Sequence, residues 1–312
     1  MAAITKASAV LVASAMGLAV SPPAWSCSIC RCGDPTFNAL GKEGIAQTGL
    51  RVALDWEQVS KTQGLRDEDF SSVDEDRVTL LAAWGISDRW SVIARVPFSD
   101  RQLTEIEDGE TEHASASGLS DPEIYGQVRL WSSAFEGEVG NRSSLYLVAG
   151  VKTAWGENDA SSAGERLDEH VQPGTGSTDW FAGLSGSYQV DPHSALFASI
   201  QFRDTGRNDA GYQYGEIFLL NLAYERKLSS RWDSAIEANY RNADRDRIDF
   251  TDTLDPDTGG SVVYLTPRIL FDAGSGWVWR ASAQLPVSES GLHGVQDEKP
   301  VLNIGVTHLF GK

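Results

Sequence analysis

The sequence alternates between apolar and polar residues over most of its length. From residue 49 onward, apolar or aromatic side chains recur at every second position in segments of about ten residues. In the segment 90–98 every even-numbered residue is apolar, whereas Ser91 and Arg95 belong to the opposite face. A period of two residues is that of a β-strand, in which successive side chains point to opposite faces. The pattern therefore predicts strands with one apolar and one charged face.

The number and spacing of these segments predict how the strands are connected. Short turns such as ISDR, VDPH, KLSSR and DAGSG alternate with long polar stretches, and the connection at 132–143 is a longer exception. An even strand number with short turns on one side is typical of bacterial outer-membrane barrels. We therefore expect an all-β fold, a transmembrane antiparallel up-and-down β-barrel of about 12 strands. The segments begin near residues 49, 76, 90, 121, 143, 178, 194, 214, 231, 260, 276 and 299, and the long stretches span about 60–75, 104–119, 156–177, 204–213, 244–259 and 287–298.

A soluble β-sandwich or a lipocalin-like barrel would show the same alternation, with its apolar face turned inward. The tryptophans favour the membrane barrel, because aromatic side chains concentrate at the two membrane–water interfaces, near the ends of the strands. Eight of the ten tryptophans are expected at or near strand ends: Trp56, Trp84, Trp90, Trp131, Trp155, Trp180, Trp232 and Trp277. The apolar face is therefore expected to meet lipid.

The charged face would then line the lumen. Its residues carry both signs, so the lumen either holds water or is closed by ion pairs between its walls. A barrel of this size is also narrower than porins of 16–18 strands, which restricts passage. The residues expected to line the lumen are Arg51, Asp55, Glu57, Arg95, Arg129, Lys152, Glu216, Glu225, Glu237, Arg241, Arg268 and Arg280.

The first residues predict export. Lys6 precedes an apolar stretch, and small residues stand before Cys27, so residues 1–26 are interpreted as a signal peptide cleaved after Ser26. Residues 27–48 would form an N-terminal cysteine segment that plugs the lumen, and residues 49–312 the barrel. We expect the protein in the bacterial outer membrane, with both termini in the periplasm and the long acidic loops outside the cell.

All three cysteines lie close together in the N-terminal segment, as Cys27, Cys30 and Cys32. No histidine follows them in the pattern that attaches haem, so a cytochrome is not expected. Three interpretations remain: a disulfide, a soft metal ion such as copper or zinc, and lipid attachment at Cys27. No cofactor is certain on this evidence.

Charge and the remaining chemistry limit the partners. The formal net charge of −18 disfavours nucleic-acid binding, and no apolar run long enough for a membrane helix follows the signal. Lipid, lipopolysaccharide and a small-molecule or ion substrate are the expected partners, while the oligomeric state is left open. The five histidines form no cluster in the sequence, and no set of catalytic residues has an informative spacing, so an enzyme is not expected.

Three phrases carry a family resemblance: GISDRWSVIARVPF at 85–98, GLSDPEIYGQVRLW at 118–131 and VQPGTGSTDWFAGLSGSY at 171–188. They resemble the outer-membrane transporter family associated with meta-pathway phenol degradation. The resemblance implies a barrel over about residues 49–310 and a transport function, without catalytic residues. Read physically, the glycines in GLSDP and QPGTGSTD would allow positive φ, and Asp or Ser side chains would cap turns before strands.

The function expected from the sequence is an outer-membrane channel or transporter for small solutes, gated or assisted by the cysteine segment. The alternative is a non-conducting outer-membrane protein that binds a metal or a partner and uses the barrel as its anchor. An outer-membrane hydrolase with a loop-borne site is a third, less favoured interpretation.

Overall fold

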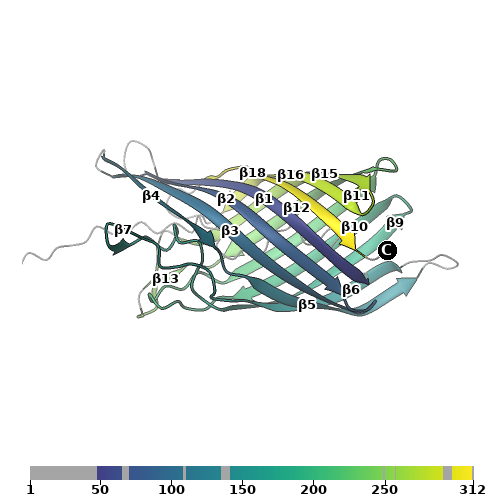
Figure 1. Cartoon of the computed structure of the whole chain (residues 1–312), viewed down its shortest axis with the longest axis horizontal. Helices are drawn as coiled ribbons and strands as arrows, with labels where there is room; N and C mark the ends of the chain where they lie inside the picture. Colours follow the sequence, from purple (N-terminus) through teal and green to yellow (C-terminus); the bar gives the residue numbers. More distant parts are fainter. Residues whose placement is uncertain are drawn as a thin grey trace, which may run out of the picture.

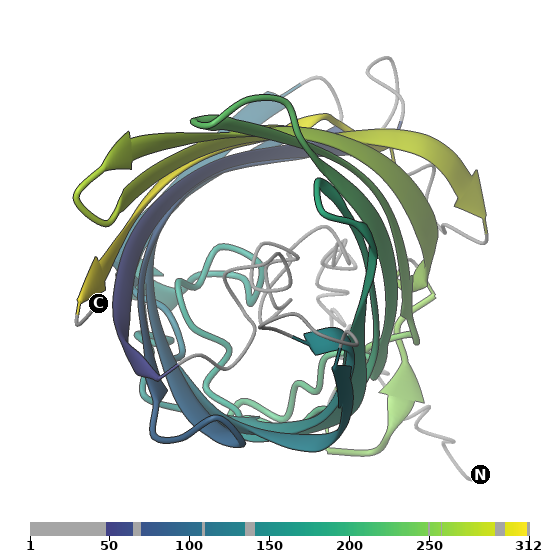
Figure 2. The same ribbon diagram turned by 90° about the vertical axis from the view of Figure 1, so that its right-hand side faces the viewer.

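The computed structural model describes residues 48–64, 70–107, 110–134, 141–248, 250–256, 258–290 and 297–310, and these residues form a closed antiparallel β-barrel (Figures 1 and 2). β1 closes it by pairing with both β2 and β18. Twelve strands make up the wall within the described residues, which confirms the predicted fold class. They are β1 (Gly49–Gly64), β2 (Phe70–Gly85), β3 (Trp90–Glu107), β5 (Glu123–Ala134), β6 (Asn141–Lys152), β9 (Asp179–Asp191), β10 (Ser194–Asp204), β11 (Ile217–Lys227), β12 (Trp232–Ala243), β15 (Gly260–Gly274), β16 (Trp277–Ser290) and β18 (Val301–Phe310).

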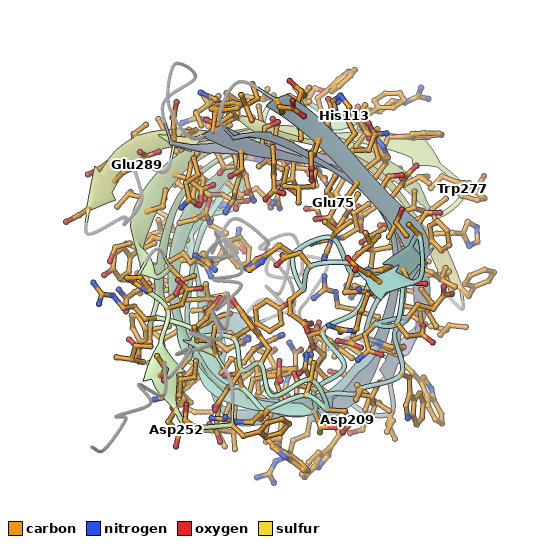
Figure 3. The ribbon with its side chains drawn as sticks, turned by 90° about the vertical axis from the view of Figure 1, so that its left-hand side faces the viewer. Glu75, His113, Asp209, Asp252, Trp277 and Glu289 are labelled. Atoms are coloured by element: carbon orange, nitrogen blue, oxygen red, sulfur yellow. The ribbon has the colours of Figure 1, made fainter. Side chains whose placement is uncertain are left out.

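The apolar faces of the strands point outward. On β1, Leu54 is 49% exposed, whereas its neighbour Asp55 is 5% exposed. Figure 3 shows the same division, with Glu75 inside the ring of strands and Trp277 on its outer surface. A sandwich or a lipocalin-like barrel would bury the apolar face, so both are excluded as descriptions of this chain.

Exposed tryptophans surround the end of the barrel that carries the short turns. Trp180 lies at the opposite end of the wall, and Trp155, which is 75% exposed, lies in the loop beyond it. Trp56 does not fit the prediction, because β1 continues eight residues beyond it and leaves it in the middle of the strand. The tryptophans beside the short turns are Trp84, Trp90, Trp131, Trp232 and Trp277.

The wall is higher on one side than on the other. β1 and β2 have 16 residues each and β3 has 18, whereas β10 and β11 have 11 each. β4 (Glu110–Leu119) forms a hairpin with β3 that extends the high side (Figure 1). The predicted loops at 60–75 and 104–119 are therefore largely strand, which corrects the sequence prediction.

The strand that follows β3 is interrupted at residues 120–122. β3 pairs with β5 over Trp90–Arg95 and with β4 over Phe98–Glu107, so β4 and β5 are two parts of one line. Pro122 has no N–H to give to the ladder, and the Ser120 N–H bonds the Pro97 carbonyl at 2.9 Å. The interruption turns the GLSDP motif toward the barrel interior.

Three long connections fold over the lower side of the wall, at 153–178, 205–216 and 244–259 of the described residues. We call these three loops the cap. They contain the short strands β7 (Ser161–Ser162), β8 (Glu165–Arg166), β13 (Arg247–Ile248) and β14 (Thr253–Leu254), while β17 (Asp297–Glu298) pairs with β1. Figures 2 and 3 show loop segments across part of the barrel opening. Val171, Tyr212 and Tyr214 of the cap pack against Val73 of β2 and Leu103 of β3, so the cap touches the high wall.

Candidate functional site

The structure buries most of the residues that the sequence assigned to the lumen. Arg129 near the short-turn end of β5 is half-buried, and so is Glu216, which precedes β11 and belongs to no strand. The role of all twelve residues in lining a passage for solutes stays a prediction. The ten buried members are Arg51, Asp55, Glu57, Arg95, Lys152, Glu225, Glu237, Arg241, Arg268 and Arg280.

Buried ion pairs join several strands inside the barrel, including strands that are not adjacent in the sheet. Glu123 of β5 binds Arg95 of β3 at 2.7 Å and Arg203 of β10 at 2.5 Å. Lys152 of β6 lies 2.9 Å from Asp121 and 3.2 Å from Asp179 of β9. We call these six residues the wall cluster. Its three cations and three anions compensate one another, which is the condition under which buried charges are tolerated.

A second group of charges lies beside the wall cluster, on β1, β2 and β3. Glu75 is its centre: Arg77 lies 2.9 Å away, Arg101 lies 3.4 Å away, and the Ser99 hydroxyl donates to it at 2.6 Å. Glu57 is 3.9 Å from Arg77. This group is also electrically balanced.

Further pairs of polar side chains lie along the remaining wall. Arg268 binds Glu237 at 2.9 Å, and Arg280 binds Asp55. A row of hydrogen-bonded neutral side chains crosses β10, β11, β12 and β15. Asn221 donates to Ser199, Asn239 donates to Asn221, and Thr266 donates to Asn239. Such ladders brace the barrel and leave its described inner surface without a dominant sign of charge.

Between the two charged groups lies a cavity of about 30 Å³. A site of this volume holds about two water molecules. Its walls come from β2, β3, β5, β6, residues 120–121 and the cap, and include Arg77, Arg95, Arg101 and Lys152. The cavity therefore has room for ordered water between the two groups of charges.

One stretch of the inner wall is apolar. Tyr125 and Phe181 meet edge to face with centroids 5.7 Å apart and pack with Ile93 and Val148. Gly150 lies between the two rings: a Cβ there would be 2.3 Å from Cβ of Tyr125 and 2.8 Å from the Phe181 ring. The apolar patch therefore depends on glycine for close approach. The sequence pattern did not predict this apolar patch, because Ile93 and Phe181 stand at the alternate positions that belong to the charged face.

Asp121 fastens the longest cap loop to the wall. Its carboxylate accepts hydrogen bonds from the Thr175 N–H at 2.7 Å, the Thr175 hydroxyl at 2.6 Å, the Gly156 N–H at 2.9 Å and Lys152. The GLSDP and QPGTGSTD motifs therefore meet in space. Gly174 has no positive φ, and a Cβ on it would lie 2.8 Å from Gly156, so its role is close approach.

His170 joins the three loops of the cap to one another. It is 1% exposed, and its Nδ1 lies 2.7 Å from Asp168 of the same loop. Its Nε2 lies 3.2 Å from the Tyr212 hydroxyl in the second loop, and Tyr212 donates to Asp246 in the third. Burial and the neighbouring Asp246 carboxylate raise the pKa of Tyr212 well above its usual value of 10.0, so Tyr212 keeps its proton.

The metal and signal-peptide predictions cannot be placed on this structure. Cys27, Cys30 and Cys32 lie outside the described residues, as do residues 1–26. No group of three or more potential metal ligands occurs within the described ranges. Nor do those ranges contain a helix with the length and apolar character needed to cross a bilayer.

No protein-family model matches the sequence, and no curated protein matches it. Solved structures match in fold. The COG4313 outer membrane channel from Pseudomonas putida F1 superposes with a TM-score of 0.59 at 10% identity, covering 85% of this chain and 96% of that one. The toluene transporter TbuX from Ralstonia pickettii gives 0.47 at 9% identity, covering 86% and 91%. The translocator domain of autotransporter NalP from Neisseria meningitidis gives 0.46 at 14% identity, covering 86% and 92%. At these identities the likeness is one of fold.

Proposed function

We propose that this protein is an outer-membrane channel for small solutes. The observation that carries the proposal is the closed twelve-strand barrel, whose outer face is apolar and edged by tryptophan and whose inner face is charged. Only a closed barrel satisfies all the backbone hydrogen bonds of strands in lipid. Its fold likeness to the COG4313 outer membrane channel supports the same function.

The proposed orientation places the short turns and both termini in the periplasm, with the long acidic loops and the cap outside the cell. The partners there are outer-membrane lipid and lipopolysaccharide. Acidic loops at a mouth concentrate cations and repel anions. The proposed solutes are therefore neutral or cationic rather than strongly anionic. A link to phenol degradation, which the family resemblance implies, is a narrower form of the same proposal.

Reconstitution of the full chain in planar bilayers tests the channel. Discrete conductance steps in purified protein support it, and their absence from preparations that are shown to be folded and inserted contradicts it. A matched protein preparation that was heated to unfolding controls for detergent leakage. A panel of neutral solutes of increasing size in liposome-swelling assays then measures the width of the passage.

A second candidate is a non-conducting protein anchored by its barrel. The observation that favours it is the compensated network of buried ion pairs across the inner wall. In this version the N-terminal cysteines bind a metal or a partner. Elemental analysis of the full chain and of a variant with all three cysteines changed to serine tests for the metal, which only the full chain should contain. In this version, the folded and inserted protein should show no conductance in planar bilayers.

Gating by the cysteine segment is a separate proposal. A cysteine-free variant should then lose any difference in conductance between oxidising and reducing conditions. If the wild type itself conducts equally under both conditions, the cysteines do not gate the channel through their redox state. The fold likeness to channels gives no support to the hydrolase interpretation.

A further inference from the structure

We infer that the cap is a pH-sensitive closure, held shut by a doubly protonated His170 that links its three loops. The inference concerns the state of the loops and does not require that the barrel conduct.

Hydrogen-bond satisfaction determines the protonation state of His170. Asp168 Oδ1 lies 2.7 Å from Nδ1 and already accepts the His170 backbone N–H at 2.8 Å, so it is an acceptor on that side. On the other side, Tyr212 donates its single proton to Asp246, so its oxygen can only accept from Nε2 at 3.2 Å. A neutral imidazole has one N–H, and two acceptors require two. The imidazolium satisfies both contacts.

The charges around His170 favour the same state. From its own loop it faces Asp168, Glu169 and Arg166, and Arg166 is paired with Glu169. From the second loop it faces Tyr212 and Tyr214, whose rings lie 5.6 Å and 6.1 Å from its own. From the third loop Asp246 lies 3.9 Å from Nε2, and Asp255 donates its N–H to the Asp246 carbonyl. From the wall, Arg101 binds the carbonyl of Gln172. The facing charged groups named here are four carboxylates and two arginines.

Loss of the imidazolium proton removes one of these linkages. A neutral His170 protonated on Nδ1 leaves the Tyr212 oxygen without its donor, and one protonated on Nε2 turns a lone pair toward Asp168. The first state removes the contact between the loops directly, and the second removes the contact with Asp168 that holds the ring in place within its own loop. The stabilisation from His170 is therefore present at low pH and is lost as the pH rises through the titration of the folded protein.

The direct test is nuclear magnetic resonance of the full chain labelled with ¹⁵N-histidine, with the His170 signal identified from the His170→Gln variant. We expect both ring nitrogens to carry protons at pH 7. A neutral tautomer at that pH would overturn the inference.

The second test is hydrogen exchange in residues 153–178, corrected for the intrinsic effect of pH. Wild-type protection should fall by about tenfold or more from pH 6 to pH 9, because a hydrogen bond to a charged group contributes about that factor. His170→Gln should show the low protection at both values. Asp246→Asn should keep the response and shift it to lower pH, and His193→Gln in an exposed short turn should behave as wild type.

Retention of the wild-type pH response in His170→Gln would overturn the inference. A pH response of protection in Asp246→Asn that is not shifted to lower pH would also overturn it. This second variant keeps the test decisive if His170→Gln fails to fold. If exchange follows the prediction and no bilayer conductance appears at any pH, the channel proposal fails while the pH-sensitive closure stands.

Discussion

Asp121 and Thr175 are 54 residues apart in the sequence and share two hydrogen bonds, at 2.7 Å to the Thr175 amide and 2.6 Å to its hydroxyl. The interruption between β4 and β5 places Asp121 at the barrel interior, and the loop at 153–178 returns to meet it. Two motifs that look like independent turns in the sequence thus form one fastening between the cap and the wall.

Replacement of Asp121 by alanine should destabilise the barrel by about 3–5 kcal/mol, because it leaves a buried lysine with one carboxylate fewer. Thr175→Val removes the hydroxyl alone and should cost about 1 kcal/mol. Urea unfolding of lipid-folded protein measures both. Asp88→Ala, in an exposed short turn, is the control, and an Asp121→Ala variant as stable as this control would refute the fastening.

Gly150 should resist enlargement. A methyl group there meets Tyr125 at 2.3 Å and the Ile124 carbonyl at 2.6 Å, so Gly150→Ala should cost about 1–3 kcal/mol of unfolding free energy through overpacking. Gly126→Ala on the adjacent strand meets nothing closer than 3.9 Å and should change stability by less than about 0.5 kcal/mol. Equal effects of the two substitutions would argue against the apolar patch as described.

A charge on the outer face should reveal whether that face lies in lipid. Leu80 is outward on β2 and 48% exposed, so Leu80→Arg should lower the stability in bilayers by about 2–4 kcal/mol if it lies near the midplane. Asp74→Arg, an outward position of the same strand nearer the loops, should have little effect. Leu80→Arg protein that folds into liposomes as stably as wild type would count against a membrane-spanning wall.

The cap should also loosen in acid. Burial alone would raise the pKa of Asp168, but the charge of His170 and its two hydrogen bonds outweigh burial and lower that pKa below its usual 3.8. The stabilisation is therefore present above 3.8 and is lost as the pH falls through the lower folded value. Hydrogen exchange of 153–178 in Asp168→Asn should lack this acid-dependent loss, and a profile identical to wild type would contradict the assignment.

The strand pattern could be predicted from the sequence because lipid-facing positions must be apolar at every second residue. The strand ends could not. Above the apolar band the outward face is no longer regularly apolar, and β4 reads ETEHASASGL, so alternation no longer indicates a strand and the hairpin of β3 and β4 looks like a loop in the sequence. The burial of individual charged side chains could also be predicted, because they stand at the alternate strand positions opposite the apolar face. Their partners could not, because Glu123 on β5 pairs with Arg203 on β10, which is 80 residues away in the sequence and is separated from β5 by β6 and β9 in the sheet.

The unequal height of the wall offers a way to establish which end of the barrel faces the outside. Glu107 and Glu110 pair at the end of β3 and β4, four residue pairs beyond the Leu103–Ala114 pair that packs against the cap, so a short antibody epitope inserted between them should leave the contacts through His170 intact. Intact cells that bind the antibody would display this rim at their surface. Labelling that required the envelope to be broken would mean that the rim faces the periplasm.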